Sequence, residues 1–314
     1  MRFADPIVET HKLGGRNVYV VREDLSSPWP GPNFSKVRGV YSYLARLRAA
    51  GVCRVASVDT SISRCGWGVS YVCQELGMTH YNVCAERRQI KFYQRMSRAL
   101  GGKLVRVHGS SSTRMYYQAR RELAGVRGLL WLPNGLSLLD TLVEHRQVIA
   151  RMDKGLLSGT VVVCVSSGTI CAGIAYGMGC AGATGTLVGV MSSSFKGRFD
   201  KVTGLVRAAA RSEGRDAGAV LLRMLDAHFE YSKAARISSG TVPFPCDVYL
   251  DRKAWLWLGV HAHELREPIT FWNIGGEWDP MNGLARGLRG DGIVTAEQIE
   301  DFLTEAEGDG DGTE

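Results

Sequence analysis

Short runs of β-branched residues alternate with longer amphipathic stretches along most of this chain. The stretch 36–50 has apolar residues at the three-to-four spacing of one helix face, stops at Gly51 and leads directly into the strand-like run 52–58. The strand-like run 160–165 and the helical stretch 170–178 repeat this alternation. Strands that alternate with helices form mostly parallel sheets covered by helices, so the sequence predicts an α/β fold.

Two later segments complete the expected secondary structure. The pattern predicts a helical region over 199–234 and a closing apolar strand over 269–274. The final segment, 305–314, holds five acidic side chains and no basic one, which predicts a disordered, solubilising tail. At 314 residues, and with roughly 150 residues per domain, the chain is long enough for about two domains.

The composition is that of a folded globular protein. Hydrophobic residues make up 45% and charged residues 22% of the chain, far from the averages of disordered or fibrous proteins. The eight cysteines form no C-x-x-C pair and the N-terminal residues lack the apolar core of a secretory signal, so we expect free thiols in the cytoplasm. No run of about 18 apolar residues is present, which predicts no membrane span.

Basic side chains are concentrated in the stretch 86–127. It carries eleven of them against two acidic residues, Glu86 and Glu122, with four aromatic residues interleaved. Basic residues interleaved with aromatic ones suit phosphate neutralisation and base stacking, so this stretch is a candidate nucleic-acid surface. A pair of solvated helix faces explains the same pattern, and the sequence leaves both interpretations open.

A strand-turn-helix junction in the middle of the chain is the first candidate site. The apolar run 160–165 ends in the turn Ser166, Ser167, Gly168 and Thr169, and a helical stretch begins directly afterwards. Backbone N–H groups and hydroxyls at a helix N-terminus, where the helix dipole favours an anion, can hold a phosphate group. The turn matches neither the dinucleotide-binding motif nor the P-loop, and an ordinary strand-helix junction is the alternative.

Lys36 is the second candidate, because it stands at the start of the helical stretch 36–50. The positive end of a helix dipole disfavours an ammonium charge and lowers the pKa of the amine, which suits a nucleophilic lysine that forms a Schiff base. A solvent-facing lysine in the first turn is the alternative. The pair His261 and His263 suggests a metal site, but no third ligand is in view, so we expect a structural or surface role for it.

An early lysine, Lys36, followed near mid-chain by the Ser-Ser-Gly-Thr turn 166–169, resembles the pattern of the fold-type II pyridoxal phosphate (PLP) enzymes of the tryptophan synthase β-like superfamily. More narrowly, the chain resembles the branch of 1-aminocyclopropane-1-carboxylate deaminase and D-cysteine desulfhydrase. Six motifs carry the resemblance: R-E-D-L at 22–25, N-F-S-K-V-R at 33–38, P-N-G-L-S at 133–137, S-S-G-T-I-C-A-G at 166–173, V-Y at 248–249 with K-A at 253–254, and F-W-N-I-G-G at 271–276.

The resemblance implies a role for each matching residue. Lys36 would bind the cofactor, pyridoxal 5'-phosphate, and the turn 166–169 would hold its phosphate. Ser63 corresponds to the catalytic serine of the family, and Ser61 is its near neighbour on the substrate side. Tyr249 would lie near the substrate amino acid and, with Ser63, assist proton transfer.

Three positions depart from the family pattern. Arg64 stands where the family has an asparagine that contacts the ring hydroxyl of the cofactor, Ile62 replaces a glutamine, and Ile274 replaces a threonine. Arg64 could bind a substrate carboxylate, or its charge could lower the pKa of the ring oxygen. A one-residue insertion near Asp251 leaves the partner of the pyridine nitrogen open.

The resemblance also implies the domain organisation and the reaction. Residues 1–36 plus 156–304 would form a large PLP-binding domain and 37–155 a small domain, with the cofactor in the cleft between them and a homodimer as an open possibility. The implied reaction is elimination or deamination at Cα of a small amino acid or a cyclic relative. Two alternatives stay open. One is a PLP-dependent reaction, including decarboxylation, on an amino-acid group attached to a nucleotide or DNA, and the other is a non-catalytic binding protein with the same fold.

Overall fold

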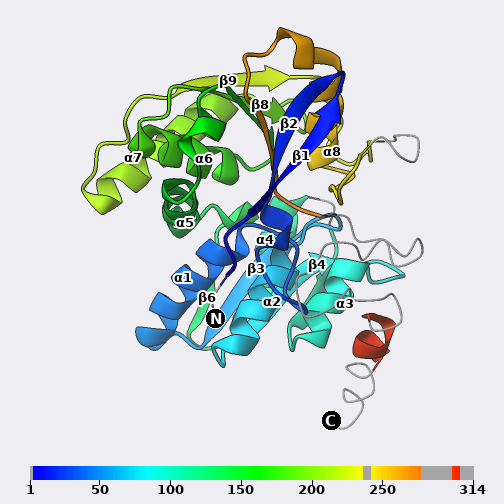
Figure 1. Ribbon diagram of the computed structural model, residues 1–314. Coiled ribbons are helices and arrows are strands. Elements are labelled where there is room, and N and C mark those ends of the chain that lie inside the picture. The colour runs from blue at the N-terminus through cyan, green and yellow to red at the C-terminus, as the bar shows by residue number, and fades with distance from the viewer. Residues whose placement is uncertain (1–2, 110, 236–241, 277–298, 305–314) are drawn as a thin grey trace.

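The computed structural model describes residues 3–109, 111–235, 242–276 and 299–304, which form two α/β units, each around its own sheet (Figure 1). This arrangement confirms the α/β class and the parallel sheets that the sequence predicted. Within these residues, none of the helices combines the length and the apolar character that crossing a bilayer requires. The acidic segment 305–314 lies outside the described residues.

The larger sheet has six strands in the order β1-β2-β10-β7-β8-β9. They are β1 (Ile7–Leu13), β2 (Arg16–Arg22), β7 (Thr160–Val165), β8 (Thr186–Met191), β9 (Leu221–Asp226) and β10 (Ile269–Asn273). β1 pairs antiparallel with β2, and every other neighbouring pair is parallel. All of β7 is buried, as expected for a central parallel strand with helices on both faces.

Helices cover both faces of the larger sheet (Figure 1). They are α5 (Leu139–Ala150), α6 (Thr169–Ala181), α7 (Arg198–Glu213) and α8 (Asp251–His261). Side chains alternate between the two faces along β7. Val161 and Val163 pack in the core formed with α5, α6 and α7, whereas Val162 and Cys164 pack in the core formed with α8.

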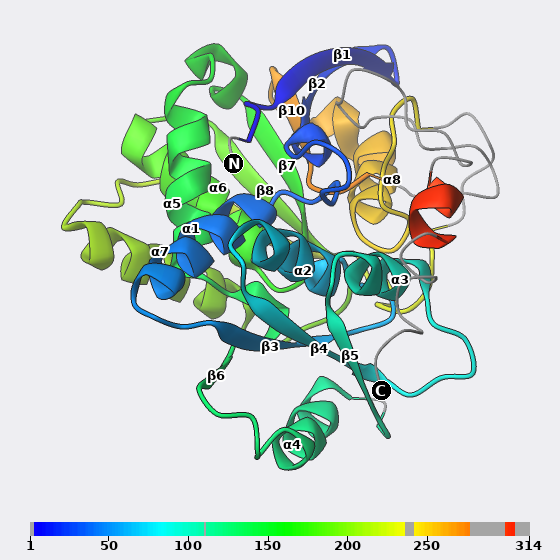
Figure 2. The ribbon, with the colours of Figure 1, turned by 90° about the horizontal axis from the view of Figure 1, so that it is seen from below.

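The smaller sheet has four parallel strands in the order β5-β4-β3-β6. They are β3 (Arg54–Asp59), β4 (Thr79–Ala85), β5 (Lys103–Val107) and β6 (Leu129–Trp131). Three helices, α1 (Val37–Ala49), α2 (Cys65–Glu75) and α3 (Phe92–Ala99), lie on one face, and α4 (Ser112–Glu122) lies on the other (Figure 2). Met115 and Ala119 of α4 pack against Val83 and Val107 of the sheet.

Parts of the fold differ from the sequence-based expectations. The region 199–234 was expected to be helical throughout. In the structure the helix α7 ends at Glu213, and the edge strand β9 follows within the same region. The helix ends there because Gly214 caps it in a left-handed conformation, with a φ of 60°. The sequence reasoning assigned no element to β1 or α8. The helix α5 lies within the range 37–155, but it packs in the core beside the larger sheet.

Buried His80 is expected to make the stability of the small unit depend on pH. Its ring nitrogens contact Ser57 Oγ at 2.9 Å and Ser70 Oγ at 2.7 Å, and burial lowers its pKa to about 3. The unfolded chain takes up a proton below about pH 6.5 while the folded chain does not, so this stability is present at neutral pH and is lost as the pH falls towards 3.

We therefore expect the free energy of unfolding of the wild type to fall by about 2 kcal/mol more than that of His80→Gln when the pH is lowered from 7 to 5. Urea unfolding of both proteins at the two pH values measures this difference, and the comparison cancels the other titrating groups. Equal pH dependence of the two proteins would show that His80 is not held neutral.

Candidate active site

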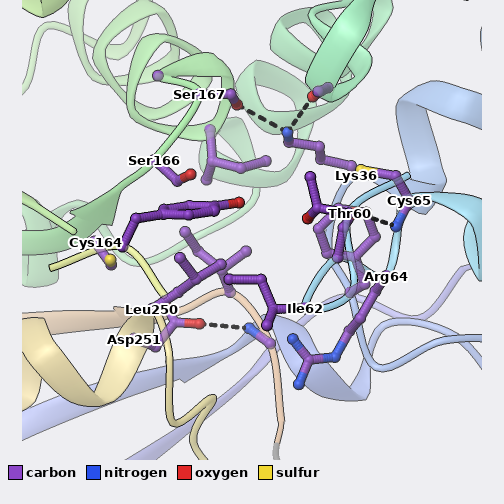
Figure 3. Close-up of a pocket in the computed structure, with 18 of the residues that line it drawn as sticks. Lys36, Thr60, Ile62, Arg64, Cys65, Cys164, Ser166, Ser167, Leu250 and Asp251 are labelled. Carbon is purple, nitrogen blue, oxygen red and sulfur yellow. Dashed lines mark hydrogen bonds between the residues drawn. The ribbon is translucent and has the colours of Figure 1, made fainter. Parts of the chain in front are cut away.

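A cavity lies between the two units and takes its lining from both (Figure 3). The small unit contributes the end of β3 and the segment Thr60 to Cys65 that leads into α2. The large unit contributes the turn after β7, Tyr231, the start of α8, and the segment after β10. The carboxyl ends of parallel strands therefore meet at this cavity, which is where α/β sheets usually bind ligands.

Lys36 reaches across this cavity. It immediately precedes α1, is 6% exposed, and its Nζ donates to Gly135 O at 2.5 Å and to Ser167 Oγ at 2.9 Å. Burial lowers the pKa of Lys36, and the nearby charges of Lys201 and Arg198 lower it further. The helix dipole was the expected cause of such a shift, whereas desolvation is its largest cause in the folded protein. Lys36 is thus a buried amine, not the solvent-facing lysine of the alternative.

The turn from Ser166 to Thr169 forms a cradle at the N-terminus of α6. Gly168 is the N-cap with a φ of 88°, and an added Cβ would lie 3.0 Å from Val202 Cγ2, so a larger residue would be strained there. Thr169 Oγ1 lies 3.1 Å from Ser167 Oγ and 3.3 Å from Ser137 Oγ. Hydroxyls grouped at the positive end of a helix are the chemistry that a phosphate requires.

The first turn of α7 adds positive charge beside this cradle. Arg198 Nη1 donates to Ser167 O at 2.9 Å, and Arg198 Nε is buried without a partner among the described residues. Burial lowers the pKa values of Arg198 and Lys201, and Arg198 adds to the effect on Lys201. A dianion bound in the cradle would offset the mutual repulsion of these cations.

Asp251 stands in another part of the cavity wall, well away from the Lys36 amine (Figure 3). It is 1% exposed, its Oδ2 accepts from Gly275 N at 3.1 Å, and its Oδ1 has no partner among the described residues. Burial, reinforced by the charge of Asp247, raises the pKa of Asp251 well above its ordinary value. A buried acid with one unpaired oxygen is a natural partner for a ring nitrogen of a bound ligand.

The structure separates Ser63 from Ser61 and redirects Arg64. Ser63 lines the cavity, where its Oγ accepts from Cys65 N at 3.0 Å, and Ser61 does not line it. The guanidinium of Arg64 turns away from Lys36 (Figure 3), donates to Asp247 Oδ2 and stacks over the ring of Tyr93 at 4.7 Å. Because Arg64 is paired with a buried carboxylate, its charge is compensated, although its Nε has no partner among the described residues.

Tyr231 lines the cavity, and Tyr249, which the sequence suggested, does not. Tyr249 is half-buried, and its backbone N–H donates to Asp247 Oδ1 at 2.8 Å. The segment with Tyr231 is held by the buried Lys253, whose Nζ donates to Glu230 O at 2.7 Å and to Ser192 O at 3.2 Å. Sequence reasoning missed Tyr231 because this residue lies inside the region that was expected to be helical.

Asp59 is a second residue that the sequence reasoning missed. It is the last residue of β3, fully buried, and its Oδ2 accepts from Gly66 N at 3.1 Å in the first turn of α2. Burial raises the pKa of Asp59 to about 7. Asp59 thereby fixes the segment between β3 and α2 that carries Thr60 and Ser63 into the cavity. Its signal in the sequence is an acidic residue directly after a strand-like run.

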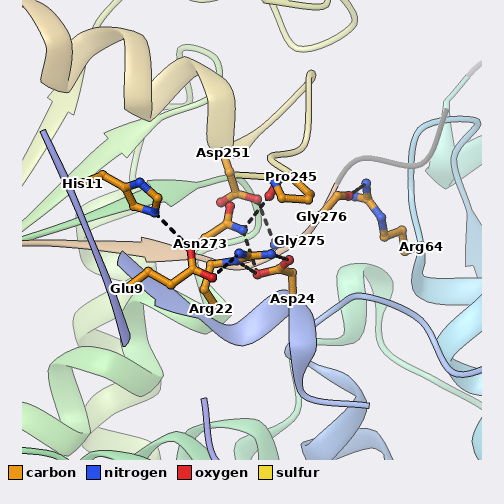
Figure 4. Close-up of polar contacts among 10 residues, drawn as sticks. All are labelled: Glu9, His11, Arg22, Asp24, Arg64, Pro245, Asp251, Asn273, Gly275 and Gly276. Atoms are coloured by element: carbon orange, nitrogen blue, oxygen red, sulfur yellow. Dashed lines mark hydrogen bonds and ion pairs between the residues drawn. The ribbon is translucent and has the colours of Figure 1, made fainter. Parts of the chain in front are cut away.

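The R-E-D-L motif supports the cavity and does not line it (Figure 4). Arg22 Nε and Nη2 donate to the two carboxylate oxygens of Asp24 at 2.8 and 2.7 Å. Asn273 Nδ2 donates to Asp24 Oδ1 at 2.8 Å, which ties the end of β10 to the end of β2. This network fixes the point from which Ile274 and Gly275 enter the cavity wall.

A metal site finds no support in the part of the chain that the structure describes. No group of three potential metal ligands among His, Cys, Asp and Glu comes together there. His261 Nδ1 contacts Glu264 Oε1 at 3.2 Å on the surface, and His263 is exposed. The polar groups of the cavity include an amine, a phosphate cradle and a buried acid.

Known proteins resemble this chain in sequence and in fold. No family model matches the chain. The chain is 33% identical over 279 residues to the "Glycyl-dTMP PLP-dependent decarboxylase" of Pseudomonas phage M6, a match that covers 85% of this chain and 97% of that protein.

Solved structures with a similar fold include a homologue of ACC deaminase, with a TM-score of 0.73, 18% identity, and coverage of 96% of this chain and 94% of that one. Threonine deaminase isoform 2 from Solanum lycopersicum has a TM-score of 0.61 and 17% identity, covering 98% and 89% of the two chains. Maize serine racemase has a TM-score of 0.61 and 13% identity, covering 89% and 92%. These likenesses show the fold-type II architecture.

Proposed function

The chain belongs to the family of the glycyl-dTMP PLP-dependent decarboxylase, a fold-type II PLP-dependent enzyme family, and we propose that it removes CO2 from an amino-acid group carried by a thymidine nucleotide. The cofactor fits the polar groups of the cavity. In this proposal Lys36 would bind the cofactor, the turn 166–169 would hold its phosphate, and Asp251 would partner its pyridine nitrogen. When bound, PLP supplies the electron sink that bond breaking at Cα requires.

The apolar part of the cavity wall is the observation that carries the decarboxylation proposal. Ile62, Leu250 and Ile274 line the cavity, and two of them, Ile62 and Ile274, replace polar residues of the deaminase branch. Arg64, the arginine among the lining residues, is paired with Asp247. A substrate carboxylate next to these residues loses its hydration without gaining a cationic partner. Such a carboxylate is destabilised relative to neutral CO2, which favours cleavage of the bond to Cα.

Proton handling falls to Lys36 and Tyr231 in this proposal. Breaking the bond between Cα and the carboxylate carbon releases CO2 and leaves an electron pair at Cα, which must then receive a proton. Burial lowers the pKa of the Lys36 amine, which favours its neutral form and so makes it a better base for taking up and returning this proton. Burial raises the pKa of Tyr231, so its phenol keeps its proton and can donate a hydrogen bond into the cavity.

Elimination or deamination of a free amino acid is the second candidate. Ser63, the counterpart of the catalytic serine in the resembled deaminase branch, lines the cavity, which favours this reaction. The two candidates differ in their products. Decarboxylation releases CO2 and keeps the nitrogen on the substrate, whereas deamination releases ammonia and keeps the carboxylate.

The test is product analysis with the PLP-loaded enzyme. We expect a glycyl-thymidine nucleotide, free or within an oligonucleotide, to lose the mass of one CO2, with matching release of CO2 in a sealed assay. Ser63→Ala and Ser61→Ala form a matched pair, because only Ser63 lines the cavity, and only its replacement is expected to alter kcat. Release of ammonia with the carboxylate retained would overturn the decarboxylation proposal in favour of the second candidate.

A further inference from the structure

A surface groove adjoins the active-site cavity on the side of α4. It lies between α4 and β6, and its aromatic lining consists of Tyr116, Tyr117 and Trp131. Val58 and Asn134 line both the groove and the cavity, so the two spaces are neighbours. Asn134 Nδ2 also donates to Ser112 Oγ at 3.0 Å, which ties the shared wall to the start of α4.

One aromatic ring of this groove, that of Tyr117, faces solvent, whereas Tyr116 and Trp131 are half-buried. Tyr117 is 61% exposed, which makes it one of the most exposed large hydrophobic side chains among the described residues. Its ring lies 5.5 Å from the ring of Tyr116, and Tyr116 in turn packs edge-on against Trp131 at 5.0 Å. The two tyrosines and the tryptophan thus form an aromatic platform whose open face is the ring of Tyr117, and a nucleic-acid base can stack on such a face.

Positive charge surrounds this platform. The helix α4 carries Arg114, Arg120 and Arg121, all exposed, and no described carboxylate forms an ion pair with any of them. Arg120 lies 5.6 Å from the ring of Tyr116 and donates to its hydroxyl at 3.0 Å, so the guanidinium is held beside the platform. Exposed arginines next to an exposed aromatic ring match the phosphates and bases of a nucleic-acid strand.

The N-terminal half of the basic stretch 86–127, which includes α3, does not expose its aromatic rings in this way. On α3, Phe92 and Tyr93 pack against the buried Trp67 at 6.0 and 6.2 Å and are only partly exposed. Arg95 on the same helix pairs with Glu300 at 3.2 Å. The helix α3 thus uses its aromatic residues for the core, whereas α4 presents Tyr117 outward.

We propose that this groove binds a nucleotide that neighbours the modified one in a single DNA strand. The base stacks on the exposed ring of Tyr117, whose edge-on neighbour Tyr116 supports it, and the strand phosphates contact Arg114 and Arg121. This inference rests on the proposed function, because it extends the nucleotide substrate of the cavity into a polymer. The modified base must be out of the base stack to enter the cavity, and a single strand meets this condition without the cost of flipping a base out of a duplex.

The first test measures binding without catalysis. The PLP-loaded full chain is titrated against a fluorescently labelled, unmodified single-stranded thymidine oligonucleotide, and anisotropy is followed at several salt concentrations. We expect Tyr117→Ala to weaken binding about tenfold, the size of one lost stacking contact. We expect Arg114→Ala to reduce the slope of log affinity against log salt by about one.

Matched controls come from α7, which does not line the groove. Phe199 is an exposed aromatic residue and Arg207 an exposed arginine of this helix, so Phe199→Ala and Arg207→Ala are expected to leave the affinity unchanged. Three outcomes would each overturn the proposal. Phe199→Ala could weaken binding as much as Tyr117→Ala does, Tyr117→Ala could leave the affinity unchanged, or RNA or duplex DNA could bind more tightly than the single strand.

The second test compares two substrates. With a modified oligonucleotide, Tyr117→Ala is expected to raise KM about tenfold with kcat unchanged, whereas KM for the modified mononucleotide stays at the wild-type value. If the enzyme does not decarboxylate either substrate but still binds DNA in a Tyr117-dependent way, the proposed function is wrong and the groove proposal stands. If both substrates are decarboxylated and KM is the same in wild type and Tyr117→Ala, the groove proposal is wrong and the proposed function stands.

Discussion

Lys36→Ala is expected to lower the rate of decarboxylation by about 10²- to 10⁴-fold, because the variant lacks the amine that takes up and returns the proton. It also lacks the side chain that we propose to hold PLP. In the wild type, borohydride reduction followed by peptide mapping is expected to place the pyridoxyl group on the peptide with Lys36, and the variant is expected to lose the visible absorbance of the bound cofactor. The readouts are therefore the spectrum, the mapped peptide and the rate.

Lys154→Ala is the control for this prediction, because Lys154 is an exposed lysine remote from the cavity lining. It is expected to keep both the spectrum and the rate. The Lys36 variant is expected to stay folded. Burying the amine costs free energy of hydration, as its lowered pKa shows, and an alanine at this position does not carry that cost. A folded Lys36→Ala protein with full biological activity would instead support the non-catalytic binding protein.

Asp247→Asn is expected to lower the free energy of unfolding by about 3 to 5 kcal/mol, because it leaves the buried charge of Arg64 without a partner. The two side chains are 3% and 1% exposed, and they join the N-cap of α2 to the segment before α8. Arg64 Nη2 also donates to Gly276 O at 2.5 Å (Figure 4). The pair therefore links the two units beside the cavity. Denaturant unfolding of wild type and variant measures the loss.

Two further variants make the interpretation specific. Replacing both partners, as Arg64→Met with Asp247→Asn, is expected to cost less than the sum of the single changes, because no uncompensated charge remains. The exposed pair Arg151 and Asp5, with side chains 51% and 57% exposed, is the surface control, and Arg151→Ala is expected to cost less than about 1 kcal/mol. An equally small cost for Asp247→Asn would show that Arg64 is not held as a buried ion pair.

The sequence by itself determined the features that depend on neighbours along the chain. A buried run followed by a Ser-Ser-Gly-Thr turn and a helix is a local pattern, and in the structure this turn forms the cradle at the N-terminus of α6. The position of Lys36 directly before a helix is equally local, and its amine meets the cradle at Ser167. The α/β class follows from the same repeated alternation of strand and helix.

Only the tertiary structure decided which side chains share the cavity and what charge they offer. Arg64 was open to several roles until folding brought Asp247, 183 residues later, against its guanidinium. Tyr231 replaced Tyr249 at the cavity because Lys253 holds the segment after β9 in place, a contact that no local pattern encodes. Burial and long-range pairing set the state of a polar side chain, and both depend on residues that are distant in sequence and adjacent only after folding.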